Sequence, residues 1–357
     1  MVVAFRLKQF GLTADVVEAR PRPGGRIHSI VNALESGLAA ELGGEAFDSD
    51  HVACLSLAQS LGLPIVDLWQ QGPTAGSDLF WFRQRRGDGA ALLAEFTTFL
   101  RARHRDWQAV QQFMQTGAVT PAIATLDMLS ISDYLARGGV SEALYQAATT
   151  AYTIKYGMEA AAQSSLNLLS YFANRGDCES WFGQSDERYY LRGGNQQLPM
   201  ALYTHVRSQV QLSTQLEAVT AQPDGQYRVT LKQGNTVGDR LYSAVVLTLP
   251  FSVLRHLPLN IELPLRQRQA IDQLCYSTPV KMFSAYHHPV WRDQGWNGLV
   301  YTDLPVHHCW EASDSVLAAT GALLVTYPGG RPGDRPGGTS GDRPHLTHQS
   351  RTALSHN

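Results

Sequence analysis

Cysteine is scarce in this chain of 357 residues. The four cysteines, Cys54, Cys178, Cys275 and Cys309, lie far apart and form no CxxC pair. This spacing argues against a disulfide framework and against a zinc site built from cysteines, because both need cysteines at matched positions. We therefore expect free thiols and a reducing, cytoplasmic compartment.

Long apolar runs and an excess of charge of one sign are also missing. No apolar stretch reaches the roughly 18 residues that a membrane span needs. The first residues, MVVAFRLKQFG, lack the apolar core and the cleavage site of a signal peptide. The formal net charge is −2, and no face is obviously basic. We expect no membrane span and no nucleic-acid partner.

Hydrophobic residues make up 44% of the chain and charged residues 17%, so a sizeable core is expected. Periodicity predicts helices at residues 2–10, 52–63 and 90–174, and strands within residues 14–19, 209–250 and 279–288. The run AVVLTL, residues 244–249, has almost no polar side, which favours a strand covered on both faces. The order of strand, helical block and strand block predicts one nucleotide-binding layer interrupted by a helical insert.

The segment ADVVEARPRPGGRIHS, residues 14–29, ends a short apolar strand on an acid, Glu18. In a βαβ unit such an acid accepts hydrogen bonds from ribose hydroxyls. Gly24 and Gly25 would let the backbone approach a pyrophosphate, and Arg26 would neutralise its charge. The alternative is an ordinary strand and Pro/Gly turn, in which Glu18 and Arg26 are only solvated.

Several segments occur together in one order, and this order carries a family resemblance. They are VVEARPRPGGRIHS, ELGGEAFDSDH, YYLRGGNQQLPMAL, AVVLTLPFSVLRHL and TPVKMFSAYHHPVW. Over residues 2–328 the chain resembles the FAD-dependent amine oxidase family, which includes monoamine oxidases, bacterial L-amino acid oxidases and their polyamine relatives. The resemblance implies FAD as cofactor and oxidation of an amine or L-amino acid to an imine, with hydride transfer to FAD and release of hydrogen peroxide.

The resemblance also implies an α/β fold. It consists of an incomplete FAD-binding Rossmann-like domain interleaved with a mainly helical substrate domain. We divide the chain into a partial FAD-binding segment (1–75), a helical substrate-domain insert (76–185), a return to the FAD-binding domain (186–258), substrate-domain strands (259–328) and a disordered tail (329–357). A homodimer is left open.

Site residues carry over from the family position by position. The implied cofactor contacts are Glu18, Ala19, Arg20, Gly24, Gly25, Arg26, Gly43, Gly44, Glu45, Ala46 and Leu216. Glu18 matches the acid that binds ribose, and the turn at residues 43–46 matches the one that passes the flavin ring. For Leu216, at the adenine, ordinary core packing is an equal alternative.

Lys281 is the implied catalytic residue. It shares a predicted strand face with Phe283 and Ala285, and a lysine on such an apolar face is costly unless its charge finds a partner. The family has a lysine here that holds a water near flavin N5. The alternative is an edge lysine that reaches solvent.

No metal site is expected. Adjacent histidines in a strand, such as His307 and His308, point to opposite faces and do not chelate by themselves. The aromatic residues Trp291, Trp296, Tyr301 and Trp310 fit either a pocket wall or core packing.

Two parts of the family pattern are not found. The GxGxxG turn that precedes a helix like AFRLKQFG does not occur, and the family-like sequence fades near LLVTYPGGRPG. The first strand of such a fold lies at the centre of its sheet, so its loss would leave unpaired backbone beside residues 14–19. We expect weak FAD binding by this chain alone, and we keep a non-catalytic truncated remnant as the alternative to an active oxidase.

Overall fold

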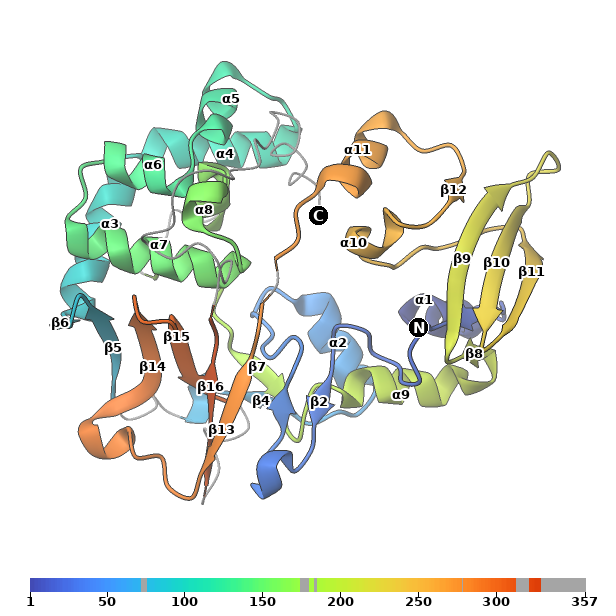
Figure 1. Cartoon of the computed structure of the whole chain (residues 1–357), viewed down its shortest axis with the longest axis horizontal. Helices are drawn as coiled ribbons and strands as arrows, with labels where there is room; N and C mark the ends of the chain where they lie inside the picture. The colour runs from blue at the N-terminus through green and yellow to red at the C-terminus, as the bar shows by residue number, and fades with distance from the viewer. Residues whose placement is uncertain (72–75, 174–179, 183–184, 278, 313–320, 329–357) are drawn as a thin grey trace.

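The computed structural model describes residues 1–71, 76–173, 180–182, 185–277, 279–312 and 321–328 (Figure 1). Cys178 and the tail at 329–357 therefore lie outside the described residues. Among the described residues, no helix combines the length and the apolar character that crossing a bilayer requires.

Six helices form a block at the upper left of Figure 1. They are α3 (Gly89–Arg101), α4 (His104–Thr116), α5 (Pro121–Met128), α6 (Ile131–Arg137), α7 (Glu142–Tyr156) and α8 (Ser165–Ala173), with the short η3 (Ala160–Ala162). Local sequence fixes several of their starts: the Asp88 side chain caps α3, Thr120 caps α5 ahead of Pro121, and Ser141 caps α7. The predicted helical character of residues 90–174 is confirmed as far as Ala173.

A six-stranded sheet lies beneath this helical block, in the order β13-β16-β15-β14-β5-β6. The strands are β5 (Ser77–Phe82), β6 (Arg85–Gly87), β13 (Met282–Tyr286), β14 (Trp296–Thr302), β15 (His308–Glu311) and β16 (Ala322–Thr326), with η5 (Arg292–Gln294) between β13 and β14. Residues 77–87, at the start of the predicted helical insert, thus form two strands that join the strands from residues 282–326.

The remaining elements lie outside the helical block and its sheet (Figure 1). The helices are α1 (Val2–Gln9), α2 (Val52–Ser60), α9 (Gln197–Val206), α10 (Phe251–Leu254) and α11 (Leu265–Gln273), with η1 (Ala33–Glu35), η2 (Trp69–Gln71) and η4 (Arg207–Gln209). The paired strands are β1 (Val16–Val17) with β8 (Val210–Gln211), β2 (Ser29–Ile30) with β3 (Ala40–Glu41), and β4 (Ile65–Asp67) with β7 (Tyr189–Leu191). A four-stranded sheet has the order β11-β10-β9-β12 and contains β9 (Thr214–Ala221), β10 (Tyr227–Gln233), β11 (Thr236–Tyr242) and β12 (Leu259–Asn260).

The prediction of a covered strand at residues 244–249 is wrong. No residue of this segment is assigned to a strand, and Val246 is 64% exposed. The strand at residues 14–19, which the prediction separated from this segment by one missing strand, is reduced to β1, which is two residues long and pairs only with β8 within the described residues. Leu247 and Leu249 still pack against the cluster that contains Val219 and Leu254, but Val246 stays exposed because the described residues supply no strand between β1 and this segment.

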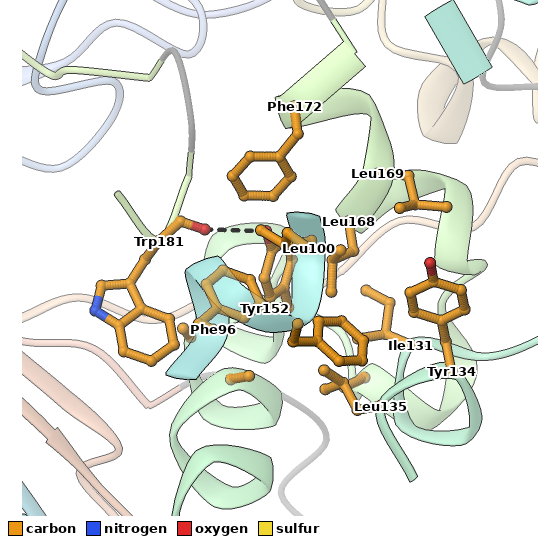
Figure 2. Close-up of a cluster of buried hydrophobic side chains, with 14 of the residues drawn as sticks. Phe96, Leu100, Ile131, Tyr134, Leu135, Tyr152, Leu168, Leu169, Phe172 and Trp181 are labelled. Carbon is orange, nitrogen blue, oxygen red and sulfur yellow. Dashed lines mark hydrogen bonds between the residues drawn. The ribbon is translucent and has the colours of Figure 1, made fainter. Parts of the chain in front are cut away.

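The main hydrophobic core lies between the helical block and the β5–β14 side of the large sheet. Figure 2 shows its centre, where Phe96, Tyr152 and Phe172 are completely buried. The Tyr152 hydroxyl donates to the Trp181 carbonyl at 3.0 Å, so its one polar atom is satisfied inside the core. The best-packed part of the chain is therefore the helical block.

Replacement of a buried aromatic ring tests whether the main core lies in the helical block. Phe96→Ala removes a completely buried ring that contacts Phe99, Phe172 and Trp181, and it should lower the free energy of unfolding by about 3–5 kcal/mol. Phe10→Ala is the control, because Phe10 is 81% exposed, and its effect should stay within about 0.5 kcal/mol. Urea denaturation measures both; equal effects of the two variants would contradict the assignment.

Candidate active site

The turn at residues 41–45 is shaped by close backbone packing at Gly43. A Cβ atom at Gly43 would overlap the Arg26 carbonyl oxygen, whereas a Cβ at Gly44 would meet no atom within 4 Å. The two glycines of the sequence motif therefore differ. Gly43 is needed to pack the turn on the loop that contains Gly24 and Arg26, and Gly44 faces open space.

Asn195, just before α9, holds the same turn from one side. Its Nδ2 donates to the carbonyl oxygens of Gly44 (3.1 Å) and Glu45 (2.7 Å), and its backbone N–H donates to Glu41 Oε1 (2.6 Å). Its Oδ1 accepts from the backbone of Leu191 at 3.0 Å. Asn195 is 3% exposed. Its motif, YYLRGGNQQLPMAL, carries part of the family resemblance, but the sequence predicted no role for Asn195 itself.

Lys281 holds the turn from the other side. Its Nζ donates to the carbonyl oxygens of Glu41 (3.1 Å) and Gly43 (3.0 Å) and to Glu45 Oε2 (3.1 Å). The Lys281 side chain is 15% exposed and that of Glu45 is 10% exposed. Lys281 precedes the edge strand β13, but it does not reach out to solvent, so the alternative of an edge lysine is wrong.

Glu41 is a second buried carboxyl group in this turn. Ser29 Oγ lies 2.9 Å from both of its carboxyl oxygens, and the residue is 7% exposed. Burial raises the pKa of Glu41, and the hydrogen bonds from Asn195 and Ser29 oppose that rise. Sequence reasoning missed Glu41 as a polar group of the site, although it stands two residues before Gly43.

The loop at residues 18–27 presents the predicted phosphate-binding residues at the surface. Glu18 Oε1 accepts from the Arg20 backbone N–H at 2.8 Å. The Arg20 and Arg26 side chains are exposed and have no hydrogen-bond or ion-pair partner within the described part of the chain. The Arg22 guanidinium instead closes the loop internally, because it donates to the carbonyl oxygens of Pro23, Gly25 and Ile27.

Gln196 closes the space between this loop and α9. Its backbone N–H donates to Ser29 Oγ at 2.9 Å, and its Nε2 donates to the Pro23 carbonyl at 2.9 Å. Its Oε1 is buried and has no partner among the described residues. A buried acceptor beside the glycine loop is therefore left over after the protein's own contacts are made.

The structure says less about three other predicted cofactor contacts, Leu216, Ala19 and Ala46. Leu216 lies on β9 and packs against the apolar cluster that contains Val219 and Leu254, which agrees with the core alternative. Ala19 is exposed in the loop after β1, and Ala46 is half-buried after the turn.

A row of aromatic rings crosses the large sheet and ends beside Lys281. Strand register pairs Phe80 with Tyr301 and Tyr301 with His308. The ring centroids of Phe80 and Tyr301 are 5.2 Å apart, and those of Tyr301 and His308 are 4.5 Å apart. The row continues to Trp310 at 5.1 Å from His308, and Lys281 Nζ lies 5.4 Å from the Trp310 ring centroid.

His308 is neutral in this row. Its Nδ1 lies 2.7 Å from the Val300 carbonyl oxygen, which only accepts, so Nδ1 carries the proton. Burial lowers the pKa of His308 to about 4. This histidine and the half-buried Trp310 form an aromatic wall beside Lys281. Trp291 instead donates to Glu311 Oε2 on β15 at 3.1 Å and packs edge-on against Tyr286 of β13.

The fold that carries these residues is that of the flavin amine oxidases. The structure resembles wild-type putrescine oxidase bound to putrescine, with a TM-score of 0.73 and 21% identity over 92% of this chain and 72% of that one. It resembles cyclohexylamine oxidase from Brevibacterium oxydans IH-35A to the same extent, with a TM-score of 0.74 and 19% identity over 92% of this chain and 72% of that one. At these identities the likeness shows the mixed α/β fold alone.

The chain belongs to the flavin-containing amine oxidoreductase family, whose model matches residues 1–337. A curated relative, the flavin-dependent L-tryptophan oxidase RebO of Lentzea aerocolonigenes, is 24% identical over 320 residues. The match covers 84% of this chain and 66% of the length of that relative. The family resemblance inferred from the five sequence segments is thereby confirmed.

The two glycines of the turn give a matched pair of substitutions. Gly43→Ala should lower the free energy of unfolding by about 2 kcal/mol or more, because its Cβ would overlap the backbone at Arg26. Gly44→Ala meets open space and should change stability by less than about 0.5 kcal/mol. Urea denaturation of both variants checks this, and a Gly44 variant as unstable as the Gly43 variant would refute the packing difference.

His308 makes stability depend on pH. Its pKa is lowered from 6.5 to about 4, so the unfolded chain binds a proton between these values while the folded chain does not. The stability gained by keeping this imidazole neutral is fully present above pH 6.5 and is lost as the pH falls toward 4, about 3 kcal/mol in total. His308→Phe should flatten the pH dependence of unfolding between pH 6.5 and 4. An unchanged slope in this variant would assign the dependence to other groups.

Proposed function

We propose that this protein oxidises an amine or an L-amino acid with FAD as its cofactor. In such reactions a hydride leaves the carbon that bears the nitrogen for the flavin, water hydrolyses the imine, and oxygen takes up the two electrons to give hydrogen peroxide. The observation that carries the proposal is the contact of Lys281 with the 41–45 turn, because it joins two family motifs 240 residues apart in the sequence.

The residues of the site fit FAD in three respects. A Cβ atom at Gly44 or at Gly25 would meet no atom within 4 Å, so the protein itself does not fill the space beside these glycines. Arg20 and Arg26 offer two exposed guanidinium groups for a pyrophosphate. The buried Gln196 Oε1 is an acceptor that the described residues leave unused.

Each group has a role in this proposal. Glu18 would accept from ribose hydroxyls, Arg20 and Arg26 would neutralise the pyrophosphate, and the 43–46 turn would contact the flavin. The aromatic wall around His308 keeps water from the reacting carbon, and such a dry environment favours the neutral, reactive form of an amine. Lys281, at the edge of this wall, holds the turn in place.

The names of the similar proteins fit small amines and an aromatic amino acid as substrates. Putrescine and cyclohexylamine oxidases act on amines by name, and RebO is an L-tryptophan oxidase by name. Trp310, the half-buried end of the aromatic wall, suits an apolar or aromatic side chain on the substrate, whereas Tyr301 and His308 are buried. The five-part division of the chain into cofactor and substrate domains remains a prediction within this proposal, as does its cytoplasmic location.

A non-catalytic chain is the second candidate, and the open segment at 244–249 favours it. A parallel strand beside β1 is part of the usual binding layer for a dinucleotide, and the turn that follows such a strand receives the pyrophosphate. The described residues place only β8 beside β1, so no strand lies on its other side, toward residues 244–249. We therefore expect the affinity for FAD to be weak.

Flavin loading and peroxide release test the proposal together. The purified chain should carry clearly less than one FAD, and with FAD in excess it should release peroxide with some member of a panel of amines and L-amino acids. Arg26→Ala should weaken FAD binding about tenfold, since a charge-assisted contact is lost. Fluorescence titration measures the affinity.

Arg137→Ala, at an exposed arginine on α6, is the control and should bind FAD like the unchanged chain. If the chain binds flavin with high affinity but releases no peroxide with any substrate of the panel, the proposed oxidase activity is wrong and the non-catalytic candidate stands.

A further inference from the structure

We propose that Glu45 is the positioning residue of Lys281. The Glu45 carboxylate, fixed by the Trp310 indole, keeps the Lys281 ammonium against the 41–45 turn. Its role in catalysis rests on the proposed function, but the placement of Lys281 itself does not.

The first step of the argument is the hydrogen-bond capacity of the ammonium. A lysine ammonium has three N–H donors, and Lys281 uses them on the Glu41 carbonyl, the Gly43 carbonyl and Glu45 Oε2, at 3.1, 3.0 and 3.1 Å. Glu45 supplies the one charged acceptor of the three. The charge of the ammonium assists all three bonds, but only Glu45 adds an opposite charge, so it makes the strongest single contact of the three.

The second step is the anchoring of Glu45. Trp310 Nε1 donates to the same oxygen, Glu45 Oε2, at 3.1 Å, and the Glu45 backbone carbonyl accepts from Asn195 Nδ2 at 2.7 Å. Both ends of Glu45 are thus held, the side chain by strand β15 and the backbone by the segment before α9. A carboxylate fixed at both ends fixes the position of its partner cation.

The third step is a comparison with the other lysine–glutamate pair of the described chain. Lys155 Nζ lies 2.7 Å from Glu187 Oε1, but Glu187 is 63% exposed, whereas Glu45 is 10% exposed. Exposed pairs contribute little because water and salt screen them. The covered Glu45–Lys281 pair has the geometry of a fixed contact, and the Glu187–Lys155 pair provides a natural control.

The experiment measures how fast each lysine is acylated by an amine-reactive ester in the folded chain. Mass spectrometry gives the rate at Lys281 relative to Lys232, an exposed lysine on β10. Glu45→Gln, which keeps an oxygen acceptor, should raise the relative rate about threefold, and Glu45→Ala about tenfold. Trp310→Phe, which keeps a ring but loses the N–H donor, should raise it about twofold.

The labelling of Lys155 separates a local effect from loosening of the whole chain. It should stay unchanged in the Glu45 variants. Glu187→Ala removes an exposed, screened pair and should therefore change the labelling of Lys155 by less than about twofold, and that of Lys281 not at all. The proposal is overturned if Lys281 labelling stays constant in both Glu45→Ala and Trp310→Phe. Because two different residues hold the contact, a variant that fails to fold does not remove the test.

A second readout links the contact to the reaction. In the FAD-loaded chain, Lys281→Met and Glu45→Gln should both slow peroxide release, because each frees the 41–45 turn that the proposed function places at the flavin, and the double variant should be no slower than Lys281→Met alone. Additive losses would overturn the positioning role. If no flavin binds, the proposed function is wrong, and the labelling result still decides the role of Glu45. If Lys281 labelling is unchanged in the variants but the chain releases peroxide, the role of Glu45 is wrong and the proposed function stands.

Discussion

The covered ammonium group of Lys281 needs acceptors around it, and this requirement determines how the two halves of the site meet. A charge removed from water is costly unless it is paired and hydrogen-bonded. The carbonyls of Glu41 and Gly43 and the carboxylate of Glu45 supply the acceptors. They belong to a turn near the N-terminus, while Lys281 precedes an edge strand of the large sheet. The turn cannot move away from that sheet without leaving an unpaired charge.

The open segment at 244–249 shows the opposite situation, in which no partner is available among the described residues. Had its unpaired backbone groups been buried, each would cost about 1–3 kcal/mol. The structure avoids this cost because every residue of the segment keeps some contact with water, and the consequence is that Val246, 64% exposed, lies at the surface while Leu247 and Leu249 are half-buried. Exposed apolar surface beside the short strand β1 favours association with other chains.

The sequence predicted those parts of the fold that depend on local pattern and on motif order. The helices of residues 89–173, the helix at 2–9 and the strand that follows Lys281 were all predictable from periodicity. The strand predicted at residues 244–249 does not form, because five apolar residues in six indicate a covered strand only if neighbouring strands exist to cover them. Periodicity indicates the preference of a segment and says nothing about the presence of its partners.

The candidate site was likewise predicted only in part. Lys281 and the 43–46 turn were predicted from motifs, and the structure brings them into contact. Glu41, Asn195 and Gln196 were missed, because a buried polar residue is recognised by its partners, and the partners of Asn195 lie about 150 residues away.

Electrostatic balance connects the lysine contact to the chemistry that we propose. An uncompensated ammonium beside the aromatic wall would repel a protonated amine on its approach. Glu45 offsets that charge, and His308, with its pKa lowered to about 4, adds none near neutral pH. The wall beside Lys281 then carries a compensated ion pair and neutral rings. Desolvation by those rings, rather than charge repulsion, is what would favour the neutral form of a bound amine.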